Sequence, residues 1–389
     1  MYKIRTYNAI SSKGLSRFAK DKYEVSSECA NPEGFILRSQ KLHTEEVPES
    51  LVAVARAGAG TNNIPTEDYT DQGIVVFNTP GANANAVKEL IVAGLLLGSR
   101  DIYGGMNYVQ ELGHMDDSGE MGKLLEKEKK RFAGSEITGK TLGVVGLGAI
   151  GSIIANLALD LGMDVIGYDP AISVEAAWQL SSRVERMDSI EALLARADFI
   201  TLHVPAIPAT KHLINKDTLG QMKPSAKILN FAREEIVSTE DLVAALDAGT
   251  IAGYISDFPA PALLGRKDVL LMPHIGASTE EAEENCAVMA ADQLMDYLEN
   301  GNIRNSVNYP PTKMARNGGT RITFTNNNVP KVLGSVLAVL ADAELNVVDM
   351  VNKSRGDIAY NIIDIQGSLT EGVEQKIAQV EGVKRVRVL

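Results

Sequence analysis

Three glycines, Gly146, Gly148 and Gly151, follow the apolar run Thr141 to Val145 with the spacing G-x-G-x-x-G. The first glycine permits a tight turn, the second lets a phosphate approach the backbone, and the third lets a helix pack closely on the strand. A strand, glycine turn and helix in this order bind a dinucleotide. The alternative is a glycine-rich βαβ unit that holds no ligand.

The residues around this turn favour NAD as the dinucleotide. The pyrophosphate would meet unpaired N–H groups near Ala149 and Ile150, at the start of the helix. Asp169 ends the next strand, where an acid accepts the hydroxyl groups of an adenosine ribose. No Lys or Arg occurs between Asp169 and Arg183, so nothing nearby would attract the extra phosphate of NADP. The acid at this position therefore favours NAD over NADP.

Three polar side chains follow three later strands: Arg233 in NFAREEIV, Asp257 in YISDFP and His274 in MPHIGAST. Oxidation of a secondary alcohol by hydride transfer needs a base for the hydroxyl proton and a cation for the neighbouring carboxylate. Histidine titrates in the useful range, and arginine offers a bidentate fork. We expect the three to converge near the nicotinamide, although His274 alone could equally be structural.

Cations also follow two strands near the N-terminus, in Arg38-Ser39-Gln40-Lys41 and in Arg56-Ala57-Gly58. Loops at the carboxyl ends of parallel strands are where such sheets bind ligands. The glycine after Arg56 exposes N–H groups that could hold a carboxylate. For any single cation, ordinary solvation is the simpler interpretation.

The elements that must position these residues predict an α/β protein with three parts. Strand and helix patterns alternate up to Thr79 and again after Thr141, which predicts two Rossmann-like, doubly wound parallel sheets. The prolines in Tyr309 to Thr312 indicate a linker. Beyond it the pattern β-α-β-β-α-β predicts a ferredoxin-like unit.

Composition narrows the partners of the chain. The 389 residues carry a formal net charge of −12 and no dense Lys/Arg run, which argues against nucleic acid and anionic membranes. No apolar run predicts a membrane span, and no metal centre is expected. Two cysteines and no signal peptide favour a cytoplasmic location.

The motifs LRSQK, VARAGAGTNNI, GKTLGVVGLGAIG, MKPSAKILNFAR and PHIGAS resemble those of the D-isomer-specific 2-hydroxyacid dehydrogenases, and the resemblance covers nearly the whole chain. It implies NAD-dependent oxidation of 3-phospho-D-glycerate to 3-phosphohydroxypyruvate, which commits carbon to serine. It also implies a discontinuous substrate-binding domain (1–86 and 274–308), an NAD-binding domain (87–273) and an ACT-like regulatory domain (318–389). A homodimer or homotetramer is expected.

The resemblance also assigns roles to residues. His274 would be the general acid/base and Arg233 the substrate-anchoring cation. Arg56 with the amides of Ala57 and Gly58 would bind the substrate carboxylate, and Arg38, Ser39 and Lys41 would face the phosphate. The remaining cofactor contacts would be His203, Val204 and Pro205 on the adenine side, Asp257 at the nicotinamide carboxamide, and Ala232 and Gly276.

The C-terminal stretch TNNNVPKVLGSVLAVLADAELNVVDM resembles an ACT domain. Asn328 and Asn346 match asparagines that hold L-serine in regulated members of the family. Asn326 stands where those members carry histidine, and Lys331 stands where they carry glycine. A dimerisation module without a ligand is the alternative.

The chain departs from the family pattern at two places. The family has a Glu between the Asp257-like acid and the histidine, where it orients the imidazole, but FPAPALLGR contains no acid. Asp257, Glu234 or Glu235 could replace it. The family also prefers glycine after Arg233, where this chain has Glu234. The alternatives are a hydroxypyruvate or glyoxylate reductase type of enzyme and an NAD-sensing scaffold with little turnover.

Overall fold

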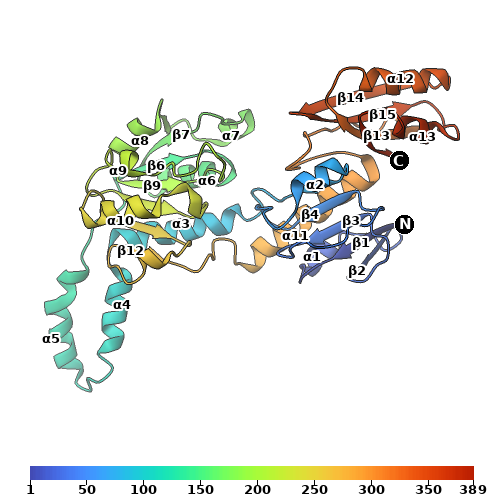
Figure 1. Cartoon of the computed structure of the whole chain (residues 1–389). Helices are drawn as coiled ribbons and strands as arrows, with labels where there is room; N and C mark the ends of the chain where they lie inside the picture. The colour runs from blue at the N-terminus through green and yellow to red at the C-terminus, as the bar shows by residue number, and fades with distance from the viewer. The chain divides into compact units, whose positions relative to one another are not determined.

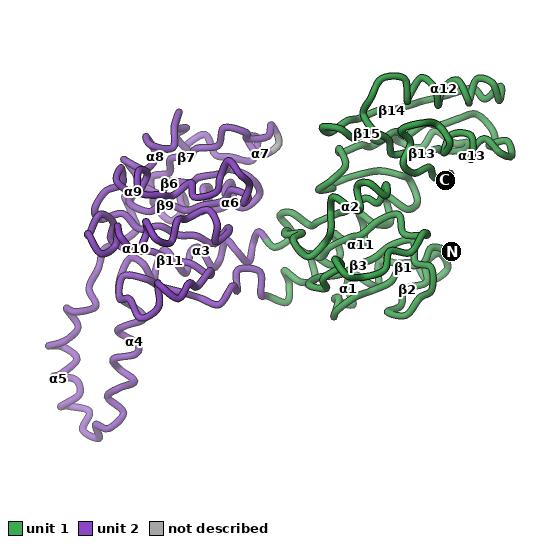
Figure 2. Tube along the Cα trace, in the orientation of Figure 1, with its two compact units in different colours: residues 1–83, 279–389 green, residues 84–278 purple. Residues whose placement is uncertain are grey.

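The structure is a computed structural model that describes residues 1–174 and 176–389. The chain divides into two compact units, coloured separately in Figure 2. Unit 1 comprises residues 1–83 and 279–389, and unit 2 comprises residues 84–278. The chain thus leaves unit 1 after Asn83 and returns to it at Thr279, and each unit is described separately below.

Unit 1 contains a five-stranded sheet in the order β2-β1-β3-β4-β5, with every pairing parallel. Its strands are β1 Tyr2–Thr6, β2 Tyr23–Ser26, β3 Gly34–Leu37, β4 Ala53–Arg56 and β5 Val75–Phe77. The predicted parallel sheet is confirmed, and β2 is an edge strand that the sequence pattern did not reveal. Leu37 pairs with Arg56, so the cation-bearing loops after β3 and β4 begin side by side.

Helices cover both faces of this sheet. The helices are α1 Ser12–Leu15, α2 Thr66–Asp71 and α11 Glu280–Asn300. Helix α11 packs its buried Ala290, Leu294 and Tyr297 against one face, and the buried ring of Tyr69 from α2 packs on the other. The hydroxyl of Thr279 caps α11, and Gly301 ends it in a left-handed conformation.

Unit 2 is built on a seven-stranded parallel sheet in the order β12-β11-β10-β9-β6-β7-β8 (Figure 1). Its strands are β6 Thr141–Val145, β7 Asp164–Tyr168, β8 Glu185–Arg186, β9 Phe199–Leu202, β10 Lys227–Asn230, β11 Gly253–Ser256 and β12 Val269–Leu271. The direction of winding reverses between β6 and β9. Ligands bind at such a switch point in open α/β sheets.

Helices of unit 2 also lie on both faces of their sheet. Helices α3 and α6 cover one face, and α8, α9 and α10 cover the other. The helices are α3 Ala84–Ser99, α4 Ile102–Glu111, α5 Ser118–Glu128, α6 Ala149–Asp160, α7 Val174–Gln179, α8 Ile190–Arg196, α9 Lys216–Leu219 and α10 Thr239–Asp247, with short 3₁₀ turns η1 Lys129–Phe132, η2 Glu234–Ile236 and η3 Pro261–Leu263.

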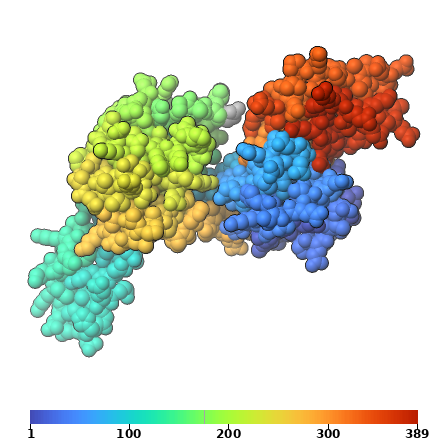
Figure 3. All heavy atoms as spheres, in the orientation of Figure 1, coloured from blue at the N-terminus to red at the C-terminus, as the bar shows by residue number. Residues whose placement is uncertain are grey.

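Helices α4 and α5 form a hairpin, called here the arm, that stands away from the rest of unit 2 (Figure 3). Neither helix contains a buried residue. The sequence pattern did not predict α4.

The C-terminal part of unit 1 is a four-stranded antiparallel sheet in the order β14-β15-β13-β16. Its elements are β13 Thr320–Asn327, α12 Val332–Asp342, β14 Val347–Arg355, β15 Ile358–Ile365, α13 Val373–Ala378 and β16 Val383–Val388. This order confirms the ferredoxin-like arrangement. Helices α12 and α13 cover one face, whereas Tyr360 and Ile362 join the core around α11 from the other.

Arginines fasten this C-terminal sheet to the rest of unit 1. Arg321 forms a buried ion pair with Asp364 at 2.6 Å and donates to the carbonyl of Asn300. Arg385 donates to the carbonyl of Leu51 at 2.7 Å. Both arginines belong to the C-terminal sheet and donate to main-chain carbonyls of the rest of unit 1, and these hydrogen bonds hold the sheet in place.

Among the described residues, no helix combines the length and apolarity needed to cross a membrane.

Candidate active site

The glycine turn of unit 2 lies at the end of β6, at the switch point. Gly146 has φ +89°, and a Cβ there would lie 2.6 Å from the carbonyl oxygen of His203. At Gly151 a Cβ would lie 1.9 Å from the carbonyl oxygen of Gly146. At Gly148 a Cβ would have no neighbour within 4 Å among the described residues. The fold itself requires Gly146 and Gly151, whereas Gly148 keeps a surface open for something else.

Helix α6 begins directly at this open surface. No side chain caps it, and its first residues are Ala149 and Ile150. The first N–H groups of a helix lack intrahelical partners, so they point at whatever occupies the turn. The open position at Gly148 and the uncapped helix together fit the pyrophosphate of a dinucleotide.

Asp169 is anchored beside the glycine turn. One carboxylate oxygen accepts the N–H of Leu147 at 2.8 Å, and the other accepts the N–H of Ala171 at 2.9 Å. These bonds fix the side chain at the end of β7 while each oxygen keeps a lone pair for another donor. The arrangement fits the predicted contact with ribose hydroxyls.

His203, Val204 and Pro205 follow β9 on the other side of the switch point. The imidazole shares a 2.9 Å hydrogen bond with the hydroxyl of Thr201. Desolvation lowers the pKa of His203 to about 3, so this ring is neutral at physiological pH. A neutral ring suits the wall of a nucleotide site better than an acid/base role.

Asn230 holds the turn that carries Ala232 and Arg233. Its amide donates to the carbonyl of Arg233 at 2.9 Å and accepts the N–H of Ala232 at 3.2 Å. Ser256 and Tyr254 in turn bond to this buried asparagine. Sequence reasoning missed Asn230, and its signal was an asparagine at the end of an otherwise apolar strand.

Asp257 connects the loop after β11 to the loop that carries His274. It is 1% exposed, and one carboxylate oxygen accepts the N–H of Gly276 at 2.9 Å. Burial raises the pKa of Asp257, an effect opposed by the Gly276 N–H and by the charges of His274 and Arg233. The structure therefore brings Arg233, Asp257 and His274 together within unit 2.

The other carboxylate oxygen of Asp257, Oδ1, is buried without a hydrogen-bond partner among the described residues. An unpaired buried acceptor costs free energy unless a ligand supplies a donor. The amide group of a nicotinamide is such a donor, so this orphaned oxygen fits the cofactor predicted from the sequence.

His274 is exposed and has φ +40°, a conformation that few residues other than glycine adopt. Its ring packs 4.9 Å from the ring of Phe258, and its N–H donates to the carbonyl of Asp257 at 2.8 Å. In the described part of the chain, no ion pair joins His274 to Asp257, Glu234 or Glu235. The proposed replacement for the missing Glu is thus not assembled in this conformation.

The cations of unit 1 gather at the carboxyl ends of β3 and β4. The Arg56 side chain donates through Nε to the carbonyl of Arg38 at 3.1 Å. The guanidinium of Arg38 pairs with Glu283 of α11 at 2.5 Å. Lys41 is exposed, as is Ser39, whose N–H donates to the side chain of Asn8. A phosphate that binds Arg38 would have to compete with the Glu283 carboxylate.

The loop after Arg56 uses its amides differently from the expectation. Ala57 donates its N–H to the carbonyl of Leu37 at 2.7 Å, and Gly58 donates to the carbonyl of Arg56 at 3.0 Å. The amides of Ala57 and Gly58, which were expected to bind a carboxylate, are therefore already engaged with main-chain carbonyls. The N–H groups of Ala59 and Gly60 have no partner among the described residues and are the available donors.

Comparison with known proteins agrees with this geometry. Residues 105–276 match the D-isomer specific 2-hydroxyacid dehydrogenase family, NAD binding domain. D-3-phosphoglycerate dehydrogenase of Haemophilus influenzae is 32% identical over 91% of this chain and 85% of its own length. The chain belongs to the D-isomer-specific 2-hydroxyacid dehydrogenase family. Unit 2 carries its NAD-binding domain.

The chain is also similar to a second curated protein and to a solved structure of this family. D-3-phosphoglycerate dehydrogenase of Synechocystis is 40% identical over 72% of this chain, which spans only about half (49%) of the Synechocystis protein. The crystal structure of NAD⁺-bound 3-phosphoglycerate dehydrogenase from Entamoeba histolytica has a TM-score of 0.61 at 26% identity. It covers 81% of this chain and 99% of its own.

In this family member, the three asparagines of the C-terminal sheet lie apart. Asn328 donates to the carbonyl of Gly356, before β15, whereas Asn346 donates to the side chain of Gln366, after β15. Asn326 is buried and accepts from Asn361 at 2.7 Å. One chain does not bring Asn328 and Asn346 together, since they bracket opposite ends of one strand.

Proposed function

We propose that the chain oxidises 3-phospho-D-glycerate to 3-phosphohydroxypyruvate with NAD, the first step of serine biosynthesis. The main support for this proposal is that Arg233, Asp257 and His274 lie together after strand ends of a domain that binds NAD. The named activity of the Haemophilus and Synechocystis relatives supports the choice of substrate.

The residues of unit 2 divide the work of holding the cofactor. Gly148, Ala149 and Ile150 would receive the pyrophosphate, Asp169 the ribose and Asp257 the carboxamide. When bound there, NAD supplies the acceptor for the hydride.

The protein's own part in the chemistry is proton transfer and anchoring. His274 would take the hydroxyl proton of the substrate, and Arg233 would hold its carboxylate and polarise the developing carbonyl. Asp257 positions the loop that carries His274. Its Oδ2 accepts the main-chain N–H of Gly276, and its main-chain carbonyl accepts the main-chain N–H of His274. These two bonds hold the backbone at His274.

The cations of unit 1 would recognise the anionic groups of the substrate. Arg56 with the N–H groups of Ala59 and Gly60 suits a carboxylate, and Arg38, Ser39 and Lys41 suit a phosphate. The ion pair between Arg38 and Glu283 favours a second candidate, a dehydrogenase of unphosphorylated 2-hydroxyacids, because it reduces the charge available to a phosphate.

A panel of phosphorylated and unphosphorylated D-2-hydroxyacids, assayed with NAD and with NADP, tests the proposal. Turnover of 3-phospho-D-glycerate with NAD should far exceed every other combination. The variant Asp169→Ala should bind NAD more weakly and accept NADP better, because the acid that repels the extra phosphate is gone. Absence of NADH formation from every substrate would favour the NAD-sensing scaffold.

We further propose that the chain works as a homo-oligomer, with two surfaces available for pairing. The arm presents exposed apolar side chains, namely Tyr103 (59% exposed), Met106 (63%) and Val109 (44%). In the C-terminal sheet, β14 pairs only with β15 in the described structure, so its other edge can pair with a second copy.

Pairing through β14 would let Asn328 of one chain approach Asn346 of another, which one chain alone does not achieve. We propose L-serine as the ligand of such a site. Calorimetry and activity with millimolar L-serine test this proposal, with Asn346→Ala as the matched variant. Absence of both heat and inhibition in the unmodified protein would leave the C-terminal sheet an assembly element.

A further inference from the structure

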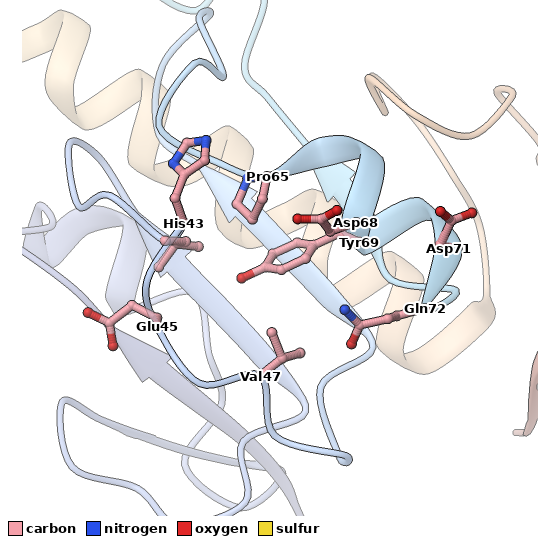
Figure 4. A pocket seen from close by; sticks show the side chains of 9 residues that line it. His43, Glu45, Val47, Pro65, Asp68, Tyr69, Asp71 and Gln72 are labelled. Carbon is pink, nitrogen blue, oxygen red and sulfur yellow. The ribbon is translucent and has the colours of Figure 1, made fainter.

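A pocket in unit 1 lies outside the residues assigned to substrate and cofactor. It has a volume of about 320 Å³ and is formed by the loop after β3 and by helix α2 (Figure 4). Leu42, Val47 and Pro65 give it an apolar wall. Three carboxylates, those of Glu45, Asp68 and Asp71, also line it.

Tyr69 provides an unsatisfied polar group in this pocket. The residue is 1% exposed, and its hydroxyl has no hydrogen-bond partner among the described residues. Figure 4 shows the hydroxyl directed into the space between His43, Glu45 and Val47. A buried hydroxyl without a partner is costly, and an occupant of the pocket would remove that cost.

The charges around this hydroxyl select the kind of occupant. Asp71 is paired with Lys384 at 2.8 Å, but Glu45 and Asp68 have no ion pair in the described part of the chain. Desolvation, together with the charges of Tyr7, Glu45 and Asp68, raises the pKa of Tyr69 to about 12. The neutral hydroxyl oxygen can accept a hydrogen bond. His43, which is exposed, is the only basic side chain in the lining.

We propose that this pocket binds a small organic cation, a primary ammonium group that carries a short apolar chain. An ammonium has three donors and no acceptor, which suits a pocket lined by carboxylates and by the unpaired oxygen of Tyr69. Its carbon chain would cover Leu42, Val47 and Pro65. In the described residues, no cluster of acids and histidines is suited to a metal ion, so an organic cation is the fitting class.

Contacts of the pocket's walls connect this site with other parts of unit 1. The loop that forms one wall runs directly from Arg38 and Lys41, and Gln40 donates to Glu45 at 3.1 Å. Arg385 of β16 donates to Leu51 at the end of this loop and to Gln72 at the end of α2. An occupant would therefore contact both walls that the C-terminal sheet holds in place.

Saturation-transfer NMR that measures the binding of n-butylamine to the 389-residue chain tests the proposal. The neutral and anionic isosteres 1-butanol and butyrate are measured under the same conditions. We expect binding of the amine with a dissociation constant of about millimolar, as suits a ligand of so few atoms. Equal signals from butylamine and butanol would overturn the proposal, because they would show no selection for charge.

Variants locate the site. Asp68→Asn and Tyr69→Phe should each weaken amine binding about five- to tenfold, since each removes one acceptor of a charge-assisted hydrogen bond. Glu46→Gln is the matched control: it also removes one carboxylate charge, from the loop that carries Glu45, but Glu46 does not line the pocket. Asp68 is exposed, so its variant tests the site even if Tyr69→Phe is unstable. Equal losses in Asp68→Asn and Glu46→Gln, or none in Tyr69→Phe, would overturn the assignment.

Discussion

The two parallel sheets of this chain end in loops at equivalent positions, but the loops differ in chemistry. At the ends of β6 and β7, the seven-stranded sheet offers glycines, unpaired N–H groups and Asp169. At the ends of β3 and β4, the five-stranded sheet offers Arg38 and Arg56. Topology fixes where each sheet can bind, and the residues at the strand ends decide what it binds.

These two sets of strand-end loops are called here the cofactor edge, in unit 2, and the cation edge, in unit 1. They also differ in how many of their polar groups already have a partner within the protein. Around the glycine turn, Gly148 faces open space and Asp257 keeps an unpaired oxygen. In the five-stranded sheet, Arg38 already holds Glu283, and the amides of Ala57 and Gly58 are engaged. The cofactor edge is ready for its ligand, whereas the cation edge must exchange internal partners for a ligand.

The largest effect should come from the variant His274→Ala. Loss of the general base should lower kcat by about 10² to 10⁴ and leave NAD affinity nearly unchanged. Steady-state kinetics and NAD titration measure the two quantities. His114→Ala on the arm is the control, because that exposed histidine is remote from the chemistry assigned to unit 2. Full activity of His274→Ala would end the proposed mechanism.

Two glycine variants should separate folding from cofactor binding at the glycine turn. Gly151→Ala should destabilise unit 2 by about 3 kcal/mol or more, because its Cβ cannot fit against Gly146. Gly148→Ala should leave the thermal midpoint almost unchanged yet weaken NAD binding, since its Cβ enters the open surface. Scanning calorimetry and NAD titration measure both. Undiminished NAD binding by Gly148→Ala would move the pyrophosphate elsewhere.

The variants Arg38→Ala and Glu283→Gln test whether the cation edge binds a phosphate. Arg38→Ala should raise KM for the phosphorylated substrate by about 10- to 100-fold, as expected for the loss of a charge-assisted hydrogen bond. Glu283→Gln should lower the same KM, because it frees the guanidinium. An unphosphorylated 2-hydroxyacid is the control substrate. Equal changes in KM for both substrates would remove Arg38 from phosphate recognition.

Local sequence patterns predicted the elements that bear the cofactor site. The strand Thr141–Val145 has the predicted bounds. Helix α4 was missed because Gly104 and Gly105 lower its helix propensity and no buried stripe marks it. The edge strand β2 was missed because its four residues are mostly only half-buried and their pattern is weak.

Pairings between distant residues could not be predicted from local patterns. The ion pair of Arg38 with Glu283 depends on how α11 packs on the five-stranded sheet. The engagement of the Ala57 amide follows from the register of β3 and β4. In both cases the sequence indicates a group that could bind an anion, but the fold decides whether that group is free to bind a ligand.

His203 should make the stability of the cofactor edge depend on pH. Its folded pKa of about 3 lies below the unfolded value of roughly 6.5, so the unfolded chain binds the proton more readily. Stability from this residue is present above pH 6.5 and is lost as pH falls toward 3. Between pH 7 and pH 4.5, the free energy of unfolding should therefore fall less in His203→Gln than in the unmodified chain, by about 1 to 3 kcal/mol. Urea unfolding at both pH values measures it, with His114→Gln as the control.

The turn between β13 and α12 in the C-terminal sheet can be compared with the glycine turn between β6 and α6. Lys331 precedes α12 with φ +78°, and no side chain caps this helix. At the glycine turn before α6, a comparable left-handed residue is Gly146. A lysine in this conformation is strained, whereas a glycine would not be. The C-terminal turn therefore costs stability that the cofactor turn avoids.

Replacing this lysine gives the smallest predicted effect. Lys331→Gly should stabilise the chain by about 0.5 to 1 kcal/mol, because relief of the left-handed strain exceeds the added entropy of the unfolded glycine. Lys376→Gly is the matched control: this exposed lysine lies within helix α13, where glycine should destabilise by about 1 kcal/mol. Thermal unfolding of the two variants should therefore shift in opposite directions. A loss of stability in both would mean that Lys331 makes a compensating contact, and that its side chain, rather than the backbone conformation, decides the residue at this turn.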